Sequence, residues 1–351
     1  MSLKIYKGSK IYVACPSGYK SGGPELLHQL CFNLKRHLGI ESEMLYFPKK
    51  LNPVHPEYAS YNLPYTFQAE DDQKNILIVS EVAEALSLLP KYKNIRKGIW
   101  FMSVDFYYFS KVRKTHTFFL SRMLNWILKQ FNKLPLFDVF SSQNLNKLIK
   151  KYDYHRDKLL LLADFYMSNT YRAIKWFNDL KPMYYLSEYL HPEFLQTKVD
   201  LSQKENIVVY NPQKGISFTR KIISLARSIK FIPIFNMTRS EVIKTLKKAK
   251  VYIDFGNHPG KDRLPREAAI LGCCVITGKR GSAAFFEDVP IPEGYKFEDK
   301  EENIPKIIAK IKDCFENFEE RYKDFEYYRK IIKEEPQRFV EDLKKIFIKV
   351  V

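Results

Sequence analysis

The sequence predicts an α/β protein with two doubly wound, Rossmann-like domains that face a cleft. The 351 residues are enough for about two domains of roughly 150 residues each. Short apolar runs alternate with amphipathic segments in both halves of the chain, which is typical of parallel strands joined by helices. A glycine-containing turn follows the first apolar run of each half. Ligands of such folds bind outside the carboxyl ends of the strands, so we expect the functional site in the cleft.

Residues 1–192 are expected to form the N-terminal domain. A strand at 10–15 leads into a glycine turn at 21–24, and a helix at 25–37 follows with its leucines on one face. The stretch 48–66 is polar and rich in Pro and Tyr, which predicts a long loop. Further strands are expected at 43–47, 75–81, 97–105, 159–163 and 183–186, and a further helix at 169–178.

Residues 193–332 are expected to form the C-terminal domain. Strands are predicted at 206–210, 231–235, 251–255 and 273–277, and helices at 217–228, at 240–248 and from about Pro265. Beyond residue 301 the chain reads as charged helix, divided by Pro336. We expect residues 333–351 to form a C-terminal helix that packs back on the N-terminal domain.

The charge balance points to anionic partners. Lys and Arg number 58 against 40 Asp and Glu, a formal net charge of +18. Such an excess favours nucleic acid, phosphorylated small molecules or an acidic membrane surface. No recognised DNA- or RNA-binding module is visible, so we do not expect nucleic acid. The 45% hydrophobic and 28% charged residues exclude a largely disordered chain.

Cysteine usage and hydropathy suggest a cytoplasmic protein. The five cysteines form no Cys-x-x-Cys pair, which favours free thiols in a reducing compartment. No signal-peptide pattern starts the chain, and no run of about 18 uncharged apolar residues occurs. We expect either a free protein or one attached peripherally to the inner face of the membrane.

Residues 111–160 combine basic and apolar side chains. Eleven basic residues stand against three acidic ones, around an apolar body that includes Phe118, Phe119 and Trp126. A basic helix with aromatic residues is a candidate for lying in a membrane interface. A core helix with a solvated basic rim explains the pattern equally well.

The segment 254–272 has the pattern of an anion site. A strand ends at Asp254, and the loop that follows contains His258, Gly260, Lys261 and Arg263, with Arg266 just beyond. A helix expected to begin near Pro265 would direct its free N–H groups toward this loop. This combination fits a phosphate or diphosphate, and Glu267, one turn into the helix, can accept hydrogen bonds from the vicinal hydroxyls of a sugar.

These motifs resemble glycosyltransferases of the GT-B fold, in the bacterial family-4-like group. The run Glu267-Ala268-Ala269-Ile270-Leu271-Gly272-Cys273-Cys274-Val275 is similar to the Glu-Ala-x-Ala-x-Gly-x-Pro-Val run of their donor domain. The turn Ser21-Gly22-Gly23-Pro24-Glu25 and the loop Asn211-Pro212-Gln213-Lys214-Gly215 resemble the loops that open their two domains. At the usual position of a second glutamate, eight residues before Glu267, this chain has Pro259.

The resemblance implies transfer of a sugar from a nucleotide-diphosphate donor to the hydroxyl of a glycan or glycolipid acceptor, in bacterial surface polysaccharide or glycolipid synthesis. It implies that the donor is held by Gly22, Gly23, Lys214, Gly260, Lys261, Arg263 and Glu267. The catalytic candidates are Asp105, His258 and Glu267, with His116 as a further counterpart of the family's N-terminal histidine. No Asp-x-Asp motif occurs, so we expect neither a metal nor a cofactor besides the donor.

Three other functions remain compatible with the sequence. A non-catalytic relative that binds sugar nucleotides would explain Pro259 in place of the glutamate. A phosphorylase or phosphoribosyl-type transferase could use the same basic loop for inorganic phosphate or a sugar diphosphate. A nucleic-acid-binding protein would explain only the charge.

Overall fold

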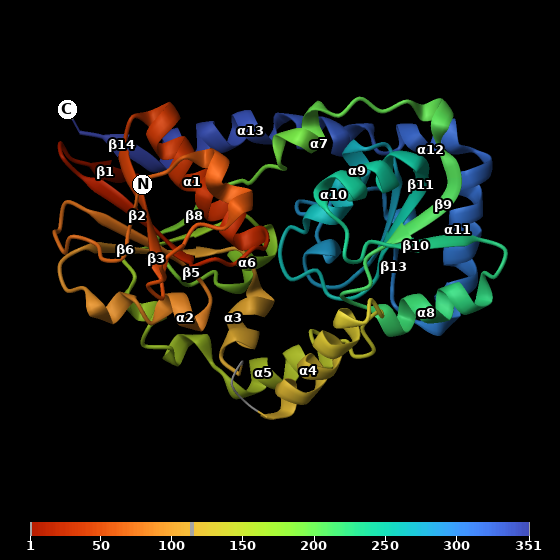
Figure 1. The fold of residues 1–351 in the computed structure, drawn as a ribbon, viewed down its shortest axis with the longest axis horizontal. Helices are drawn as coiled ribbons and strands as arrows, with labels where there is room; N and C mark the ends of the chain where they lie inside the picture. Colours follow the sequence, from red (N-terminus) through yellow and green to blue (C-terminus); the bar gives the residue numbers. More distant parts are fainter. Residues whose placement is uncertain (1, 113–115, 351) are drawn as a thin grey trace. The chain divides into compact units, whose positions relative to one another are not determined.

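The computed structural model describes residues 2–112 and 116–350, and the side chains of 116–119 lie outside this description. The chain is α/β, with parallel sheets covered by helices, as the sequence predicts (Figure 1). Within the described residues, no helix has both the length and the apolar character that crossing a bilayer requires.

The chain divides into two compact units, each built from separate stretches. The first unit comprises Met1–Lys111, Lys151–Glu188 and Pro336–Val351, and the second comprises Val112–Lys150 and Tyr189–Glu335. These stretches differ from the expected domains mainly in residues 112–150, which were expected in the N-terminal domain and are grouped with the second unit.

The first unit is built on a seven-stranded parallel sheet of order β4-β3-β2-β5-β6-β7-β8. Its strands are β2 (Lys10–Pro16), β3 (Glu41–Phe47), β4 (Tyr65–Thr66), β5 (Ile76–Ser80), β6 (Arg96–Phe101), β7 (Phe165–Ser168) and β8 (Met183–Tyr185). Its helices include α1 (Gly22–Leu38), α2 (Ala83–Leu86), α3 (Val104–Ser110) and α6 (Tyr171–Trp176). A separate parallel pair joins β1 (Leu3–Ile5) to β14 (Phe347–Lys349).

The second unit is built on a five-stranded parallel sheet of order β10-β9-β11-β12-β13. Its strands are β9 (Glu205–Tyr210), β10 (Lys230–Pro233), β11 (Ala249–Asp254), β12 (Cys274–Gly278) and β13 (Lys296–Phe297). Its helices are α4 (His116–Gln130), α5 (Ser142–Lys151, which ends at the unit boundary), α7 (Pro192–Gln196), α8 (Ile216–Leu225), α9 (Arg239–Lys248), α10 (Arg263–Ile270), α11 (Ile304–Glu316) and α12 (Phe318–Lys323). The helix α13 (Glu326–Ile346) begins in this unit and ends in the first.

Both sheets are doubly wound. In each unit the first long strand, β2 or β9, pairs with the next strand on one side and with a later strand on the other. Because parallel crossovers are right-handed, this reversal puts successive helices on opposite faces of the sheet (Figure 1). Strands covered on both faces are apolar throughout, and every residue of β5 and β12 is buried. The strand order reverses between β2 and β5 and between β9 and β11, and ligands of doubly wound folds bind at the carboxyl ends of such strands.

Two expected elements are wrong. The leucine run 159–163 forms a single 3-10 turn (Leu160–Leu162), and the strand begins only at Phe165. Asp164 explains the delay, because its carboxylate accepts the Lys97 N–H at 2.6 Å just before the ladder starts. Pro336 does not divide the C-terminal region, since α13 continues through it.

The long loop expected at 48–66 is also partly ordered. It contains a 3-10 helix, Pro56–Tyr61, and it ends in the short strand β4. His55 caps the 3-10 helix, since its ring nitrogen accepts the Glu57 N–H at 3.2 Å.

Candidate functional site

Two loops meet at the carboxyl ends of β9 and β11, where the second sheet reverses its strand order. Gly215, with φ 61°, lies against the main chain of Phe255 and Gly256. A Cβ atom at Gly215 would lie 1.7 Å from the Phe255 carbonyl oxygen, so no other residue fits this approach. The loop 211–215, called the lysine loop below, and the loop 255–262 are therefore held together by main-chain contact. Helix α8 starts from the lysine loop, and α10 starts from the loop 255–262.

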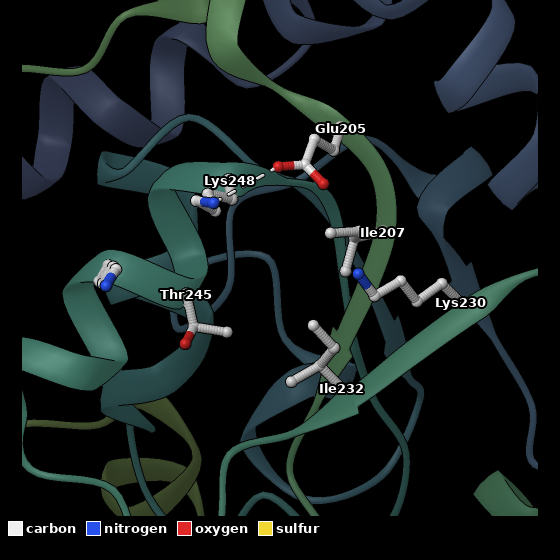
Figure 2. A pocket seen from close by; sticks show the side chains of 7 residues that line it. Glu205, Ile207, Lys230, Ile232, Thr245 and Lys248 are labelled. Atoms are coloured by element: carbon white, nitrogen blue, oxygen red, sulfur yellow. Dashed lines mark ion pairs between the residues drawn. The ribbon is translucent and has the colours of Figure 1, made fainter.

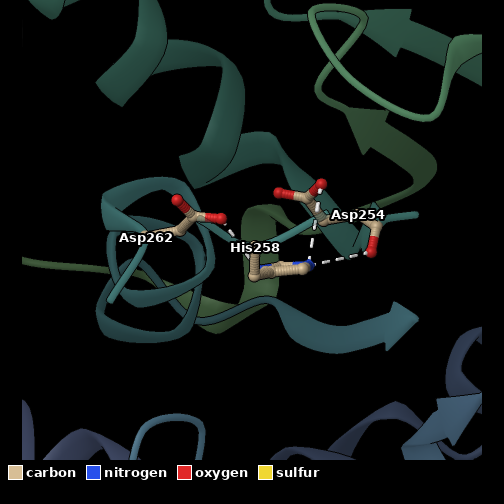
Figure 3. A group of neighbouring side chains, drawn as sticks. All are labelled: Asp254, His258 and Asp262. Carbon is tan, nitrogen blue, oxygen red and sulfur yellow. Dashed lines mark hydrogen bonds and ion pairs between the residues drawn. The ribbon is translucent and has the colours of Figure 1, made fainter. Parts of the chain in front are cut away.

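An ionic cluster lies where these loops meet. The Lys214 ammonium pairs with the Asp262 carboxylate and lies 3.6 Å from Asp254 Oδ2. His258 lies between the same two acids: its Nδ1 is 2.8 Å from Asp262 Oδ2, and its Nε2 is 3.4 Å from the Asp254 carbonyl oxygen (Figure 3). The Tyr252 hydroxyl donates to Asp254 Oδ2 at 2.8 Å, and Asp254, His258 and Tyr252 are buried.

The cluster keeps Lys214 charged. Burial alone would lower the pKa of this ammonium, but Asp254 and Asp262 outweigh it and the pKa is raised. Burial likewise acts to raise the pKa of Asp262, and Lys214 and His258 hold it below its ordinary value. The result is a buried cation whose counter-ions come from its own unit.

The same three side chains have the composition of a metal site. Asp254, His258 and Asp262 each offer a ligand atom, and these atoms lie within 4.8 Å of one another. Oxygen and imidazole ligands suit several divalent cations. The Lys214 ammonium, however, already pairs with Asp262 and lies 3.6 Å from Asp254 Oδ2, so a metal ion bound here would meet a buried positive charge. These side chains therefore fit the Lys214 ammonium better than they fit a divalent ion.

The basic loop differs from expectation in what its cations contact. Lys261 Nζ lies 2.8 Å from Glu335 Oε1, and an Arg266 guanidinium nitrogen lies 2.9 Å from Glu335 Oε2. All three side chains are buried, and Arg266 has no exposed surface. We expected these cations to face an open anion site, but Glu335 in α13 binds both of them. Arg263 remains half-buried at the start of α10.

The helix that carries Glu267 begins earlier than predicted. Asp262 is the N-cap of α10 and Arg263 its first residue, so Pro265 is the third residue. This position still lies in the first turn, where the missing N–H breaks no helical bond. Glu267 lies one turn into the helix and is 6% exposed, and Gly260 is buried in the preceding loop.

In the first unit, Glu81 lies just beyond the carboxyl end of β5. Its Oε2 accepts the Met102 N–H at 3.2 Å, which ties the end of β5 to the loop after β6. Burial raises the pKa of Glu81 from 4.5 to about 7. Gly22 and Gly23 form the first turn of α1, and a Cβ at Gly23 would lie 3.6 Å from the Met102 sulfur, an ordinary contact. The glycine pair therefore lies near Met102, but steric fit does not require Gly23 to be glycine.

Asp105 makes a buried ion pair. An Arg172 guanidinium nitrogen donates to Asp105 Oδ1 at 2.6 Å, and Asp105 is 1% exposed. Arg172 therefore fixes the position of the Asp105 carboxylate within the first unit, and a catalytic role for Asp105 stays a prediction. The side chain of His116, the other candidate, lies outside the described residues.

Sequence reasoning missed Asp254, Asp262 and Glu335. Asp254, His258 and Asp262 are spaced four residues apart, a spacing that puts side chains on one face of a helix. Here the residues between them form a loop, so the spacing alone does not predict that they meet. Glu335 follows Arg266 by 69 residues, and no local pattern connects the two.

A cavity of about 240 Å³ lies elsewhere in the second unit (Figure 2). It is at the amino ends of β9 and β10, since Glu205 and Lys230 are the first residues of those strands. Lys248 lies 3.7 Å from Glu205 on its rim. Its lining is Glu205, Ile207, Lys230, Ile232, Lys244, Thr245 and Lys248. Ligands of doubly wound folds bind at the opposite strand ends, so we do not assign the functional site to this cavity.

No family model matches the chain, and no curated protein matches it by sequence. Its fold does match solved structures. A glycosyltransferase from Rickettsia africae aligns with a TM-score of 0.62 at 12% identity, over 95% of this chain and 96% of that one. HepE from Anabaena, in complex with UDP-glucose, gives 0.56 at 10% identity over 95% and 98%. Sucrose-phosphate synthase from Thermosynechococcus elongatus gives 0.56 at 11% identity over 95% and 97%.

The buried Glu335 pair generates a stability prediction. Glu335→Gln removes the buried carboxylate that contacts both Lys261 and Arg266, so we expect the free energy of unfolding to fall by about 3–5 kcal/mol. Urea denaturation measures this change. Glu319→Gln, at an exposed position of α12, is the control and should shift the midpoint little. Equal stability of the two variants would contradict the assigned role of Glu335.

Glu81 generates a pH prediction. Because its pKa is raised in the folded protein, the carboxyl stays protonated on folding until the pH approaches 7. Its stabilising contribution is complete below pH 4.5 and is lost as the pH rises toward 7, a change of roughly 3 kcal/mol. Glu81→Gln should remove this decline in the free energy of unfolding, whereas Glu84→Gln, at an exposed position nearby, should preserve it. An unchanged pH profile in Glu81→Gln would refute the assignment.

Proposed function

Because the chain has the GT-B fold of glycosyltransferases, we propose that it transfers a sugar from a nucleotide-diphosphate donor to an acceptor hydroxyl. The donor binds the second unit and a glycan or glycolipid acceptor binds the first. The neighbours support this proposal, since HepE is described with UDP-glucose bound. The function belongs to bacterial surface polysaccharide or glycolipid synthesis.

The observation that carries the proposal is the contact between the two loops of the second unit. It puts the buried Lys214 ammonium beside the starts of α8 and α10, at the reversal point of the sheet. Free N–H groups at helix starts and a fixed cation stabilise the charge that develops on a departing diphosphate. Glu267, one turn into α10, would accept hydrogen bonds from vicinal hydroxyls of the donor.

The chemistry requires no metal ion in this proposal. The barrier to sugar transfer lies in separating an oxocarbenium-like sugar from its diphosphate leaving group. Lys214, Arg263 and Lys261 would supply positive charge where a divalent ion otherwise does. Lys214 shares its charge with Asp262 and Asp254, so it contributes less than an unpaired lysine would. Lys261 shares its charge with Glu335, so it contributes less than an unpaired lysine would. His258 holds Asp262 and thereby the lysine that Asp262 binds.

We also propose peripheral attachment to an anionic membrane, at its cytoplasmic face. Residues 120–140 expose an apolar surface, and Trp126 and Phe131 are 62% and 72% exposed. The other exposed apolar side chains of this surface are Leu120, Met123, Leu124, Ile127, Leu136, Phe137 and Phe140. Arg122, Lys129 and Lys133 are exposed among them. Cations beside exposed aromatics favour an acidic lipid surface, and such exposure speaks against a core helix. Five buried free cysteines support a reducing compartment.

Donor binding tests the proposed function. Lys214→Ala and Glu267→Ala should each raise the Kd for the preferred nucleoside diphosphate, or lower kcat/KM for its sugar conjugate, at least tenfold, or about 1.4 kcal/mol. Calorimetry with UDP, GDP, ADP and dTDP identifies the nucleotide. Lys221→Ala, which removes an exposed lysine of α8, is the control. If the wild-type protein binds none of these nucleotides, the proposal is wrong.

Two further readouts separate the alternatives. Nucleotide binding without hydrolysis or transfer, across a panel of acceptors, would identify a non-catalytic sugar-nucleotide-binding protein. Turnover that survives EDTA supports metal-independent chemistry, whereas loss restored by Mg²⁺ or Mn²⁺ would contradict it.

Vesicle cosedimentation tests membrane attachment. We expect binding to vesicles rich in phosphatidylglycerol and little binding to neutral phosphatidylcholine vesicles at low salt. Replacing Arg122, Lys129 and Lys133 by Gln should weaken binding on the order of 100-fold, since each cation contributes about 1 kcal/mol at such a surface. Trp126→Ser with Phe131→Ser should also weaken it, while Leu225→Ser, at an exposed leucine of α8, should not. Failure of the wild-type protein to sediment with acidic vesicles would rule the attachment out.

A further inference from the structure

Residues 112–150 contain one acidic side chain, Asp138, against seven basic ones. This single carboxylate is directed at the lysine loop of the second unit: Asp138 Oδ2 accepts the Gly215 N–H at 3.2 Å. Gly215 is the N-cap of α8, and no side chain of its own caps that helix. An anion therefore already occupies the main-chain amide at the start of α8.

The surroundings of Asp138 are those proposed for a diphosphate. The charges of Arg280 and Lys214 both act on its carboxylate, together with the Gly215 N–H. A phosphate oxygen would use the same partners, namely a helix-start amide and nearby cations. Asp138 and a phosphate group at Gly215 cannot occupy this position at the same time.

Four other hydrogen bonds join this segment to the rest of the second unit. The Arg220 guanidinium donates to the Pro135 carbonyl oxygen at 2.8 Å. The remaining three are side-chain bonds: Ser142 to Asn257 at 2.5 Å, Arg280 to Ser142 at 3.4 Å and Asn236 to Asn132 at 2.9 Å. They involve residues before and after Asp138, so Asp138 lies in a segment that is held on both sides of it.

The carboxylate gains little from its position. Burial raises the pKa of Asp138, and the Gly215 N–H, the two cations and the Phe140 N–H only partly offset that effect. An ionised group that is incompletely compensated at a half-buried position is readily exchanged for a better anion. A diphosphate carries more charge and more acceptor oxygens than one carboxylate.

We propose that Asp138 is an internal competitor for the donor diphosphate, and that the segment 120–150 inhibits the donor site until this carboxylate leaves the Gly215 amide. This inference rests on the proposed function, because it assigns a diphosphate to that amide. The apparent Kd for the nucleotide is then the intrinsic Kd divided by the fraction of molecules in which Asp138 is displaced. Removing the carboxylate should tighten binding, which is the opposite of what loss of a donor-binding residue does.

Calorimetry of UDP, GDP and pyrophosphate with the full chain tests the inference. Asp138→Ala and Asp138→Asn should lower the Kd for the preferred anion three- to tenfold. Glu298→Gln removes an exposed charge from the same unit and should leave the Kd unchanged, which controls for net charge. Asn132→Ala loosens the docked segment without removing its carboxylate and should tighten binding less than Asp138→Ala.

Hydrogen exchange supplies a second readout. In the wild-type protein, the bound anion should speed amide exchange in residues 132–145, because the segment is released. Asp138→Ala should show this faster exchange without any ligand. A purely structural helix cap predicts instead a less stable variant with unchanged or weaker binding.

The outcomes separate the two proposals. Tighter binding in the Asp138 variants, with ligand-induced exchange in residues 132–145, supports the internal competitor. Binding of equal or lower affinity in Asp138→Ala, or a bound anion that leaves the exchange of 132–145 unchanged, overturns it and leaves the proposed function intact. Absence of binding in the wild-type protein and in every variant overturns the proposed function, and the internal competitor with it.

Discussion

The close approach of Gly215 to the main chain of Phe255 and Gly256 is the constraint on which the candidate site depends. The lysine loop and the loop 255–262 belong to separate crossovers of the sheet, and this contact joins them. The contact brings Lys214 to Asp262 and Asp254 and aligns the starts of α8 and α10. A left-handed glycine in one loop therefore determines which charges of the other loop it meets.

The charges at this site serve two purposes. Glu335 pairs with both Lys261 and Arg266, and these three buried groups hold α13 against the start of α10. Lys214 pairs with Asp262 on the loop 255–262 and lies near Asp254 at the end of β11. A net charge of +18 therefore overstates the number of cations free to meet a substrate, because the cations nearest the site are already paired.

The segment 120–150 has two features that are separate in the sequence. Its exposed apolar and basic side chains are the basis of the proposed membrane attachment. Its single acidic residue, Asp138, accepts a hydrogen bond from the Gly215 N–H at the start of α8.

The sequence by itself determined the α/β class, the positions of most strands and the approximate starts of several helices. These features are local: apolar runs identify strands buried on both faces, and Thr238 with Glu241 forms the capping box that starts α9. Local patterns misplaced the strand at 159–163 and the break at Pro336. The partner of Asp164 is Lys97, which is distant in the sequence, and the packing that lets α13 continue through Pro336 does not depend on neighbouring residues alone. Only the tertiary structure decided which charges are paired. Glu335 lies 69 residues from Arg266, and Asp138 lies 77 residues from Gly215. Ion pairs and hydrogen bonds depend on the distance between groups in space, and the fold sets that distance for residues that are far apart in the sequence.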